Sequence, residues 1–155
     1  MVTTGGATLC ALTGTWGGSG CSGDCASSAP VAPEGSYSRE QDRLLLWLSE
    51  IDDLKPVGGA VVLFVNGSEE SADEGPGFEI LVAHVEESEY RAYPNRCTHN
   101  DKELDFLPEE GILRCCSEHS TFELSGDVIE GKATRALRLY DVQLEDERLV
   151  ILLES

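Results

Sequence analysis

Basic residues are scarce in this chain of 155 residues. Lysine and arginine together number 11, against 29 aspartate and glutamate residues, so the formal net charge is −18. Binding to phosphate backbones and to anionic membrane surfaces depends on basic side chains. The charge balance therefore argues against a nucleic-acid-binding protein. Histidine is scarcer still, with three residues, which limits how many metal sites imidazoles can hold.

Long apolar runs are also missing. The longest uninterrupted run, Ala60 to Val65, is far shorter than the roughly 20 residues of a membrane-spanning helix. No basic residue precedes Arg39, and Ala7 to Leu12 is too short for the apolar core of a secretory signal. We therefore expect no membrane span and predict a cytoplasmic protein.

Residues 1–38 have the composition of a tail. They hold eight of the sixteen glycines, many small residues, and no lysine or arginine. Such a segment buries too little apolar surface to offset the entropy lost on ordering, so we expect it to be flexible or to dock on a partner. Its cysteines, Cys10, Cys21 and Cys25, match no zinc spacing, and a cytoplasmic setting disfavours a stable disulfide. Incidental thiols are the simplest interpretation, with a metal or disulfide role left open.

Residues 39–155 predict a separate all-β domain. Seven runs have strand length and are rich in β-branched, leucine or aromatic residues, and turn residues such as Asn66-Gly67 separate them. Many short strands at this spacing are typical of a small antiparallel sandwich or barrel. A short helix over residues 41–51 is the alternative for the first run. The expected strands are Leu44–Leu48, Ala60–Val65, Phe78–Val85, Tyr90–Tyr93, Ile112–Cys115, Leu137–Leu144 and Leu149–Leu153.

Two of the three histidines stand close to cysteines. The first motif is Cys97-Thr98-His99, and the second, after sixteen intervening residues, is Cys116-Ser117-Glu118-His119. Two thiols and two imidazoles on two loops make a four-ligand metal site, suited by residue type to zinc or to an iron–sulfur cluster. The single residue between Cys97 and His99 favours the cluster, because one loop then supplies two neighbouring irons. A single zinc usually takes its loop ligands two to four residues apart.

These motifs and their flanks resemble the Rieske family, whose C-x-H and C-x-x-H motifs bind a [2Fe–2S] cluster with two cysteines on one iron and two histidines on the other. The resemblance covers roughly Leu44 to Leu153. It includes Tyr90-Arg91-Ala92-Tyr93 before the first motif and Gly111-Ile112-Leu113-Arg114 before the second. It implies a Rieske-type fold in which a subdomain of two loops holds the cluster through Cys97, His99, Cys116 and His119.

The second motif departs from the family pattern. Family members commonly have proline after the second ligand cysteine and glycine after the second ligand histidine, and this chain has neither. Counting back from Phe122 without gaps puts Cys115 at the cysteine position and Glu118 at the histidine position. We prefer Cys116 with His119, because their spacing preserves the loop geometry. Cys115 with His119 is the alternative, and an altered or absent cluster is the third.

The resemblance implies one-electron transfer. We expect a ferredoxin-like carrier, or a small electron-transfer subunit of a larger redox complex, that exchanges electrons with a reductase or another oxidoreductase subunit and is not itself an enzyme. Oxygenase chemistry needs a second iron held by two histidines and a carboxylate, and only His84 remains for it. We interpret His84 as a packing residue within a strand. The alternative function is a zinc-binding or cluster-less regulatory subunit on the same fold.

In cytochrome bc-type members a disulfide joins the two ligand loops. Lys102 occupies the position of its first cysteine here, and neither Ser117 nor Glu118 supplies the second. Together with the excess of acidic residues, which disfavours adding an electron, this predicts a reduction potential in the lower part of the family's range. The acidic surface is expected to guide encounters with basic redox partners, with solubility alone as the alternative.

Overall fold

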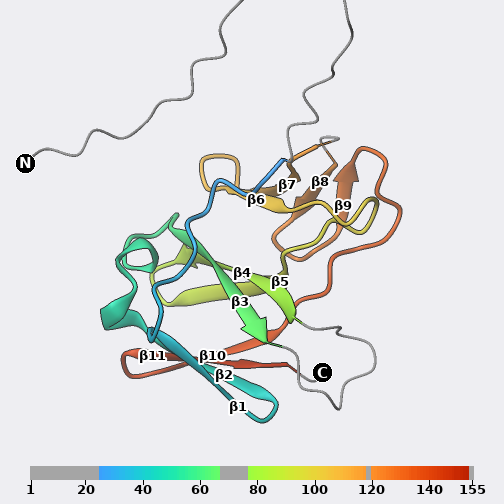
Figure 1. The fold of residues 1–155 in the computed structure, drawn as a ribbon. Helices are drawn as coiled ribbons and strands as arrows, with labels where there is room; N and C mark the ends of the chain where they lie inside the picture. Colours follow the sequence, from blue (N-terminus) through green and yellow to red (C-terminus); the bar gives the residue numbers. More distant parts are fainter. Residues whose placement is uncertain (1–24, 67–76, 118–119, 154–155) are drawn as a thin grey trace, which may run out of the picture.

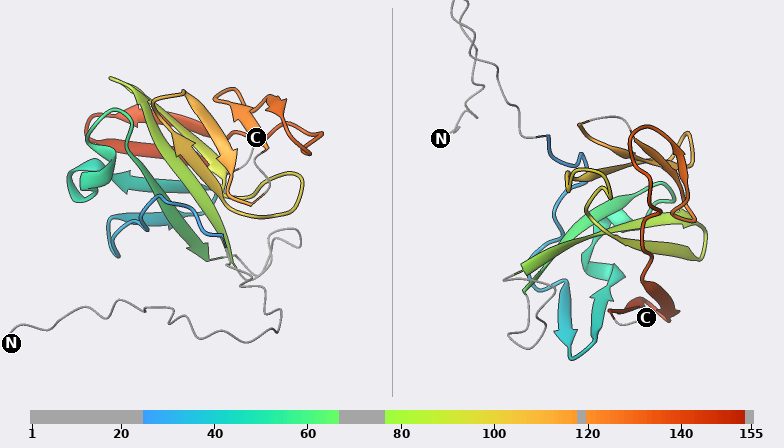
Figure 2. Two further views of the ribbon diagram at one scale, coloured as in Figure 1. Left: turned by 90° about the horizontal axis from the view of Figure 1, so that it is seen from above. Right: turned by 90° about the vertical axis from the view of Figure 1, so that its right-hand side faces the viewer.

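Three antiparallel sheets are stacked in the computed structural model, which describes residues 25–66, 77–117 and 120–153. Figure 1 shows the three sheets one above another, and the right-hand view of Figure 2 shows the same arrangement from the side. The first sheet has the strand order β1-β2-β11-β10, the central sheet β3-β4-β5, and the third sheet β6-β7-β8-β9. Each sheet is antiparallel throughout.

The strands are short, apart from those of the central sheet. Two 3-10 turns, η1 (Leu48–Glu50) and η2 (Asp52–Leu54), connect the first sheet to the central one. No helix in the described ranges is long and apolar enough to cross a membrane. The strands are β1 (Tyr37–Glu40), β2 (Arg43–Trp47), β3 (Ala60–Asn66), β4 (Gly77–Glu86), β5 (Glu89–Pro94), β6 (Leu104–Leu107), β7 (Ile112–Cys115), β8 (Thr121–Glu123), β9 (Val128–Glu130), β10 (Asp141–Glu145) and β11 (Arg148–Leu152).

The central sheet is buried on both faces, which explains why the runs of β3 and β4 are almost continuously apolar. Successive residues of a strand point to opposite faces, so one pair of strands supplies two cores. The core shared with the first sheet contains Leu46, Leu63, Val65, Ile80, Val82, Leu149 and Ile151. The core shared with the third sheet contains Val62, Leu81, Ala83, Tyr93, Cys97, Leu104, Leu113, Cys115 and Phe122.

The all-β prediction is confirmed, and six of the seven expected strands lie within one or two residues of observed ones. The helix alternative for residues 41–51 is wrong, because residues 43–47 form β2. The expected strand Leu137–Leu144 begins only at Asp141. Its first residues cross between sheets: Leu137 packs in the core of the third sheet, and Tyr140 packs in the core of the first. Strands β1, β6, β8 and β9, each of four residues or fewer, were not among the expected strands.

Residues 25–38 differ from the expected tail. They run from the third sheet, along the central sheet, to the start of β1 (Figure 1). Ser27 and Ser28 bond to residues of β6 and the residue before it, and Val31 pairs with Val62 of β3. Residues 25–38 therefore pack against the β domain, whereas the sequence predicted a separate tail that ends at residue 38. Residues 1–24, with Cys10 and Cys21, lie outside the described residues.

Tyr93 ties the central sheet to the third sheet. Its hydroxyl donates to the carbonyl of Leu124 at 2.8 Å, and Nη1 of Arg91 donates to the same oxygen at 2.7 Å. Tyr93 is fully buried. Loss of hydration on burial raises the pKa of its hydroxyl to about 12, while the nearby Arg91 acts in the opposite direction.

We expect Tyr93→Phe to lower the free energy of unfolding by about 1 kcal/mol, because a buried hydrogen bond is lost. The raised pKa adds a pH dependence. Tyr93 stays neutral in the folded protein while the unfolded chain ionises near pH 10, so its contribution is complete below pH 10 and is lost as the pH rises to about 12. Thermal unfolding followed by circular dichroism at neutral and alkaline pH measures both effects.

Tyr37→Phe is the matched control, since the Tyr37 hydroxyl donates to the carbonyl of Phe64 at 2.9 Å in an exposed position. This control should change stability less than Tyr93→Phe. If Tyr93→Phe and the unaltered protein lost stability equally steeply above pH 10, the assignment to Tyr93 would be incorrect.

Candidate metal centre

Two loops beside the third sheet carry the predicted ligands. The first joins β5 to β6, and the second joins β7 to β8. The first loop closes on itself at Cys97: the Cys97 amide donates to the carbonyl of Lys102 at 2.7 Å, and the Asp101 amide donates to the carbonyl of Cys97 at 3.0 Å. Asp101 has φ of 58°, a left-handed conformation that aspartate tolerates better than most residues. This closure keeps Cys97 fully buried.

Asn95 anchors the first loop at both ends. Its amide and its Nδ2 donate to the backbone and the carboxylate of Glu79, at 2.9 and 3.0 Å. Its Oδ1 accepts from the amide of Leu104, the first residue of β6, at 3.0 Å. Asn95 is 5% exposed, so these bonds replace those it would make with water. The role of Asn95 depends on contacts with Glu79, sixteen residues away, so the local sequence does not reveal it.

Ser120 and Gly131 hold the exit of the second loop. The Cys115 amide donates to the carbonyl of Ser120 at 2.8 Å. The buried hydroxyl of Ser120 accepts from the amides of Lys132 and Ala133, at 3.0 and 3.1 Å. Gly131 has φ of 101°, and a Cβ there would lie 2.5 Å from Cα of Ser120. Only glycine fits this close approach without displacing the backbone. Residues 118 and 119 of this loop lie outside the described residues.

The thiols of Cys97 and Cys115 lie next to each other. Both side chains are fully buried in the core of the third sheet, and neither is in a disulfide. Burial raises the pKa of the Cys97 thiol; the backbone amide of His99 lowers it, the hydrogen-bonded thiol of Cys115 raises it, and the amide of Asn100 lowers it. Two adjacent sulfur atoms, one on the first loop and one at the end of β7, suit a shared metal, and the amides of His99 and Asn100 partly offset the net rise in the pKa of Cys97.

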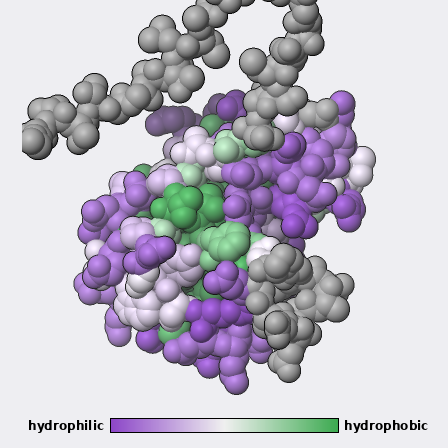
Figure 3. Space-filling view, viewed as in Figure 1, coloured by the Kyte–Doolittle hydropathy of each residue, from purple (hydrophilic) through white to green (hydrophobic). Residues whose placement is uncertain are grey.

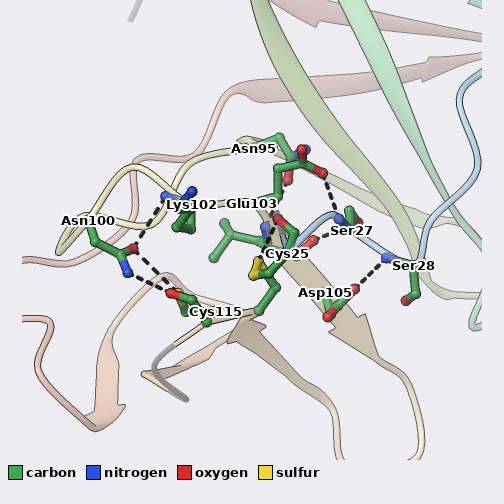
Figure 4. Close-up of a disulfide and its surroundings, with 12 residues drawn as sticks. Cys25, Ser27, Ser28, Asn95, Asn100, Lys102, Glu103, Asp105 and Cys115 are labelled. Atoms are coloured by element: carbon green, nitrogen blue, oxygen red, sulfur yellow. Dashed lines mark hydrogen bonds between the residues drawn. A yellow bond between two sulfur atoms is a disulfide. The ribbon is translucent and has the colours of Figure 1, made fainter. Parts of the chain in front are cut away.

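Asn100 and Ser117 connect the two loops beside this thiol pair. Nδ2 of Asn100 donates to Oγ of Ser117 at 2.6 Å. Sγ of Cys115 lies 3.5 Å from Oδ1 of Asn100 and 3.7 Å from Oγ of Ser117. Figure 4 shows Asn100 and Cys115 linked on one side of the view, with Cys25 and Ser27 on the other. The polar groups nearest to the Cys115 sulfur thus come from both loops.

Cys116 is engaged elsewhere. It forms a disulfide with Cys25, and the two Cα atoms are 5.6 Å apart. The expectation that Cys25 is an incidental thiol is therefore wrong. The sequence favoured Cys116 as the ligand. In the structure, the cysteine next to Cys97 is Cys115. The reason is the side-chain alternation of β7, which turns Cys115 toward the core.

The histidines are distributed as follows. His99 is exposed on the first loop, two residues after Cys97, and His119 lies outside the described residues. His84 is buried and stacks on Tyr90 with ring centroids 4.2 Å apart, so its interpretation as a packing residue is confirmed. Within the described ranges, no group of three or more Cys, His, Asp or Glu residues converges as metal ligands. The thiol pair is the part of the centre that the structure displays, and it fits the cysteine-bound iron of a [2Fe–2S] cluster.

Two solved structures are similar in fold. The cyanobacterial plasma membrane Rieske protein PetC3 from Synechocystis PCC 6803 has 23% identity, over 48% of this chain and 76% of that chain, with a TM-score of 0.44. The ferredoxin of carbazole 1,9a-dioxygenase from Nocardioides aromaticivorans IC177 has 22% identity, over 65% of this chain and 89% of that chain, with a TM-score of 0.47. No curated protein matches the chain.

A sequence model of the Rieske [2Fe-2S] domain matches residues 46–141. This range contains both ligand loops, the thiol pair of Cys97 and Cys115, and every strand of the central and third sheets. The match covers well over half of the sequence. The chain therefore belongs to the Rieske [2Fe–2S] domain family.

Proposed function

We propose that this protein is a one-electron carrier, acting alone as a ferredoxin or as a small subunit of a larger redox complex. The observation that carries the proposal is the pair of adjacent buried thiols, Cys97 and Cys115, placed by two loops inside a Rieske domain. The [2Fe–2S] cluster of this family accepts and releases one electron at a time. Redox proteins are the partners that such a carrier needs.

We propose Cys97 and Cys115 as the thiolate ligands and His99 and His119 as the imidazole ligands. The contact between the Cys97 and Cys115 thiols supports the first pair, and the disulfide of Cys116 argues against that residue as a ligand while the bond is intact. His99 keeps its position in the C-x-H motif. His119 is retained because it is the one histidine in the second motif.

The surrounding residues give the two cysteines a dry and polarised setting. Complete burial of Cys97 and Cys115 excludes water from the sulfur atoms. The amides of His99 and Asn100 stabilise negative charge on the Cys97 sulfur, and the Ser117 hydroxyl lies beside the Cys115 sulfur. Hydrogen bonds to ligand sulfur atoms and burial are among the means by which a protein sets a cluster's reduction potential.

We expect Cys115→Ser to abolish cluster binding and Cys116→Ser to retain it, because the thiol of Cys115 lies beside that of Cys97 while Cys116 is in a disulfide. Iron and sulfide analysis, with electron paramagnetic resonance of the reduced protein, measures this for the full chain. Cys97→Ser is the positive control for loss. Normal iron in Cys115→Ser together with loss in Cys116→Ser would restore the ligand pair suggested by the C-x-x-H spacing. Zinc in place of iron in the unaltered protein would contradict the proposed function itself.

The reduction potential should lie in the lower part of the family's range, between about −150 and 0 mV. The net charge of −18 disfavours addition of an electron. No disulfide joins the two ligand loops within the described residues; Lys102 stands in the first loop, and Cys116 is bonded to Cys25 instead. A redox titration followed by electron paramagnetic resonance gives the midpoint, and a value well above zero would contradict this expectation.

The negative charge is shared between the cluster-bearing part of the chain and the rest nearly in proportion to their lengths. Residues 95–135 contain five basic and nine acidic residues, a net charge of −4, whereas the remainder of the chain carries −14. Hydrophilic residues cover most of the face seen in Figure 3, with an apolar area near its middle. We propose that the acidic residues raise the rate of encounter with basic redox partners.

Electron transfer to a basic redox protein should slow as the ionic strength rises, because salt screens the attraction between separated charges. Stopped-flow mixing of the reduced protein with a basic and an acidic acceptor, across a salt series, measures the effect. The acidic acceptor is the control, and its rate should rise with salt. If the rates with both acceptors were independent of salt, the acidic residues would serve solubility alone.

A further inference from the structure

Residues 25–32, which we call the strap, lie across the junction of the third and central sheets. At one end, the Ser27 amide donates to the carboxylate of Glu103 at 2.6 Å, and the Ser27 hydroxyl donates to the carbonyl of Leu104 at 2.7 Å. At the other end, the Ala32 amide donates to the carbonyl of Val62 at 2.9 Å, and the Val62 amide donates to the carbonyl of Pro30 at 2.8 Å. The strap therefore bonds to the third sheet and to the central sheet at once.

The disulfide fixes the end of the strap to the second ligand loop. Cys116 directly follows the proposed ligand Cys115, and its amide donates to the carbonyl of Glu103 at 3.1 Å. The carboxylate of Glu103 also accepts the hydrogen bond from the Ser27 amide. The disulfide and the hydrogen bonds to Glu103 therefore lie close together (Figure 4). Any movement of the strap end is thereby transmitted to the residue beside Cys115.

The four described cysteines differ in their access to solvent. Cys25 and Cys116 are partly exposed, whereas Cys97 and Cys115 are fully buried. Thiol–disulfide exchange requires that the attacking thiolate reach a sulfur atom. A dissolved dithiol can therefore attack the disulfide while the proposed ligand thiols remain protected.

We propose that the Cys25–Cys116 disulfide is a thiol–disulfide exchange site that reversibly locks the strap onto the second ligand loop. The co-reactant is a dithiol. One of its thiolates attacks a disulfide sulfur to give a mixed disulfide, and its second thiol resolves that intermediate. The dithiol loses two electrons and two protons to become a disulfide, and Cys25 and Cys116 take them up as two thiols.

Opening the lock has two consequences for the centre, the second of which rests on the proposed function. The strap keeps its bonds from Ser27 and Ser28 to Glu103, Leu104 and Asp105, so the fold persists, but residue 116 loses its covalent anchor. The second ligand loop is then no longer held by the strap, and we expect it to release the cluster more readily. We predict a cytoplasmic protein, and disulfides in the cytoplasm are usually transient or redox-sensing. There the lock would open when reducing dithiols are abundant and close when they are oxidised.

The test uses the full chain carrying its cluster, purified without oxygen and without reductant. Dithiothreitol is the probe, and alkylation followed by peptide mass mapping identifies the reactive cysteines. We expect Cys25 and Cys116 to be alkylated only after dithiothreitol, and Cys97 and Cys115 to stay protected. Cluster loss is followed separately as bleaching of visible absorbance in the presence of an iron chelator, and it should become several-fold faster after reduction.

Cys25→Ser and Cys116→Ser are the matched variants, since each opens the lock without removing a proposed ligand. Both should lose cluster at the fast rate, and dithiothreitol should not accelerate them further, which separates opening of the lock from attack of the dithiol on the cluster. Alkylation of Cys25 and Cys116 without reductant, a bond from Cys116 to Cys10 or Cys21 instead, or an unchanged rate of loss after proven reduction would overturn the proposal. Because the mass mapping does not need a cluster, a protein found to contain no iron would refute the proposed function without deciding the exchange site.

Discussion

The burial of the central sheet on both faces is the constraint on which the rest of this structure depends. A sheet covered on one side only would alternate apolar and polar residues, but β3 and β4 must be apolar at nearly every position to serve two cores. Leu63 and Ile80 face the first sheet, and Val62 and Leu81 face the third. The second core is also where Cys97 and Cys115 lie. The same packing that joins the sheets therefore dehydrates the thiols that are proposed to hold iron.

A few buried polar groups give that dehydrated region its exact shape by satisfying backbone groups that packing alone would leave unpaired. Asn95 bonds to both ends of the first loop, Ser120 accepts two amides at the exit of the second, and Tyr93 reaches the carbonyl of Leu124. Each of these groups is costly to bury without a partner. Their arrangement makes the positions of the two loops interdependent, which suits a centre whose ligands come from both.

The sequence predicts the structure correctly where neighbouring residues carry the signal. Apolar runs located β2, β3, β4, β5, β7 and β11, and the two Cys/His motifs with their flanking segments carried the resemblance to the Rieske family. The sequence left the ligand cysteine of the second loop open, because Cys115 and Cys116 are equivalent by residue type. Cys115 ends β7 with its side chain in the core, and Cys116 follows the strand and is bonded to Cys25. Residues 25–38 were also misjudged: their small residues bury little apolar surface, and they are held by hydrogen bonds from Ser27, Ser28 and Ala32 to distant strands. Such contacts leave no periodic trace in the sequence.

The bond between Cys25 and Cys116 has a topological consequence. With a separation of 91 residues, it turns the segment from residue 25 to residue 116 into a covalent ring that contains the whole central sheet, the first ligand loop, β6 and β7. A single cut of the backbone within this ring leaves the two pieces joined through sulfur, whereas a cut after residue 116 detaches β8 to β11. The first ligand loop and Cys115 thus belong to the ring, and His119 belongs to the chain outside it.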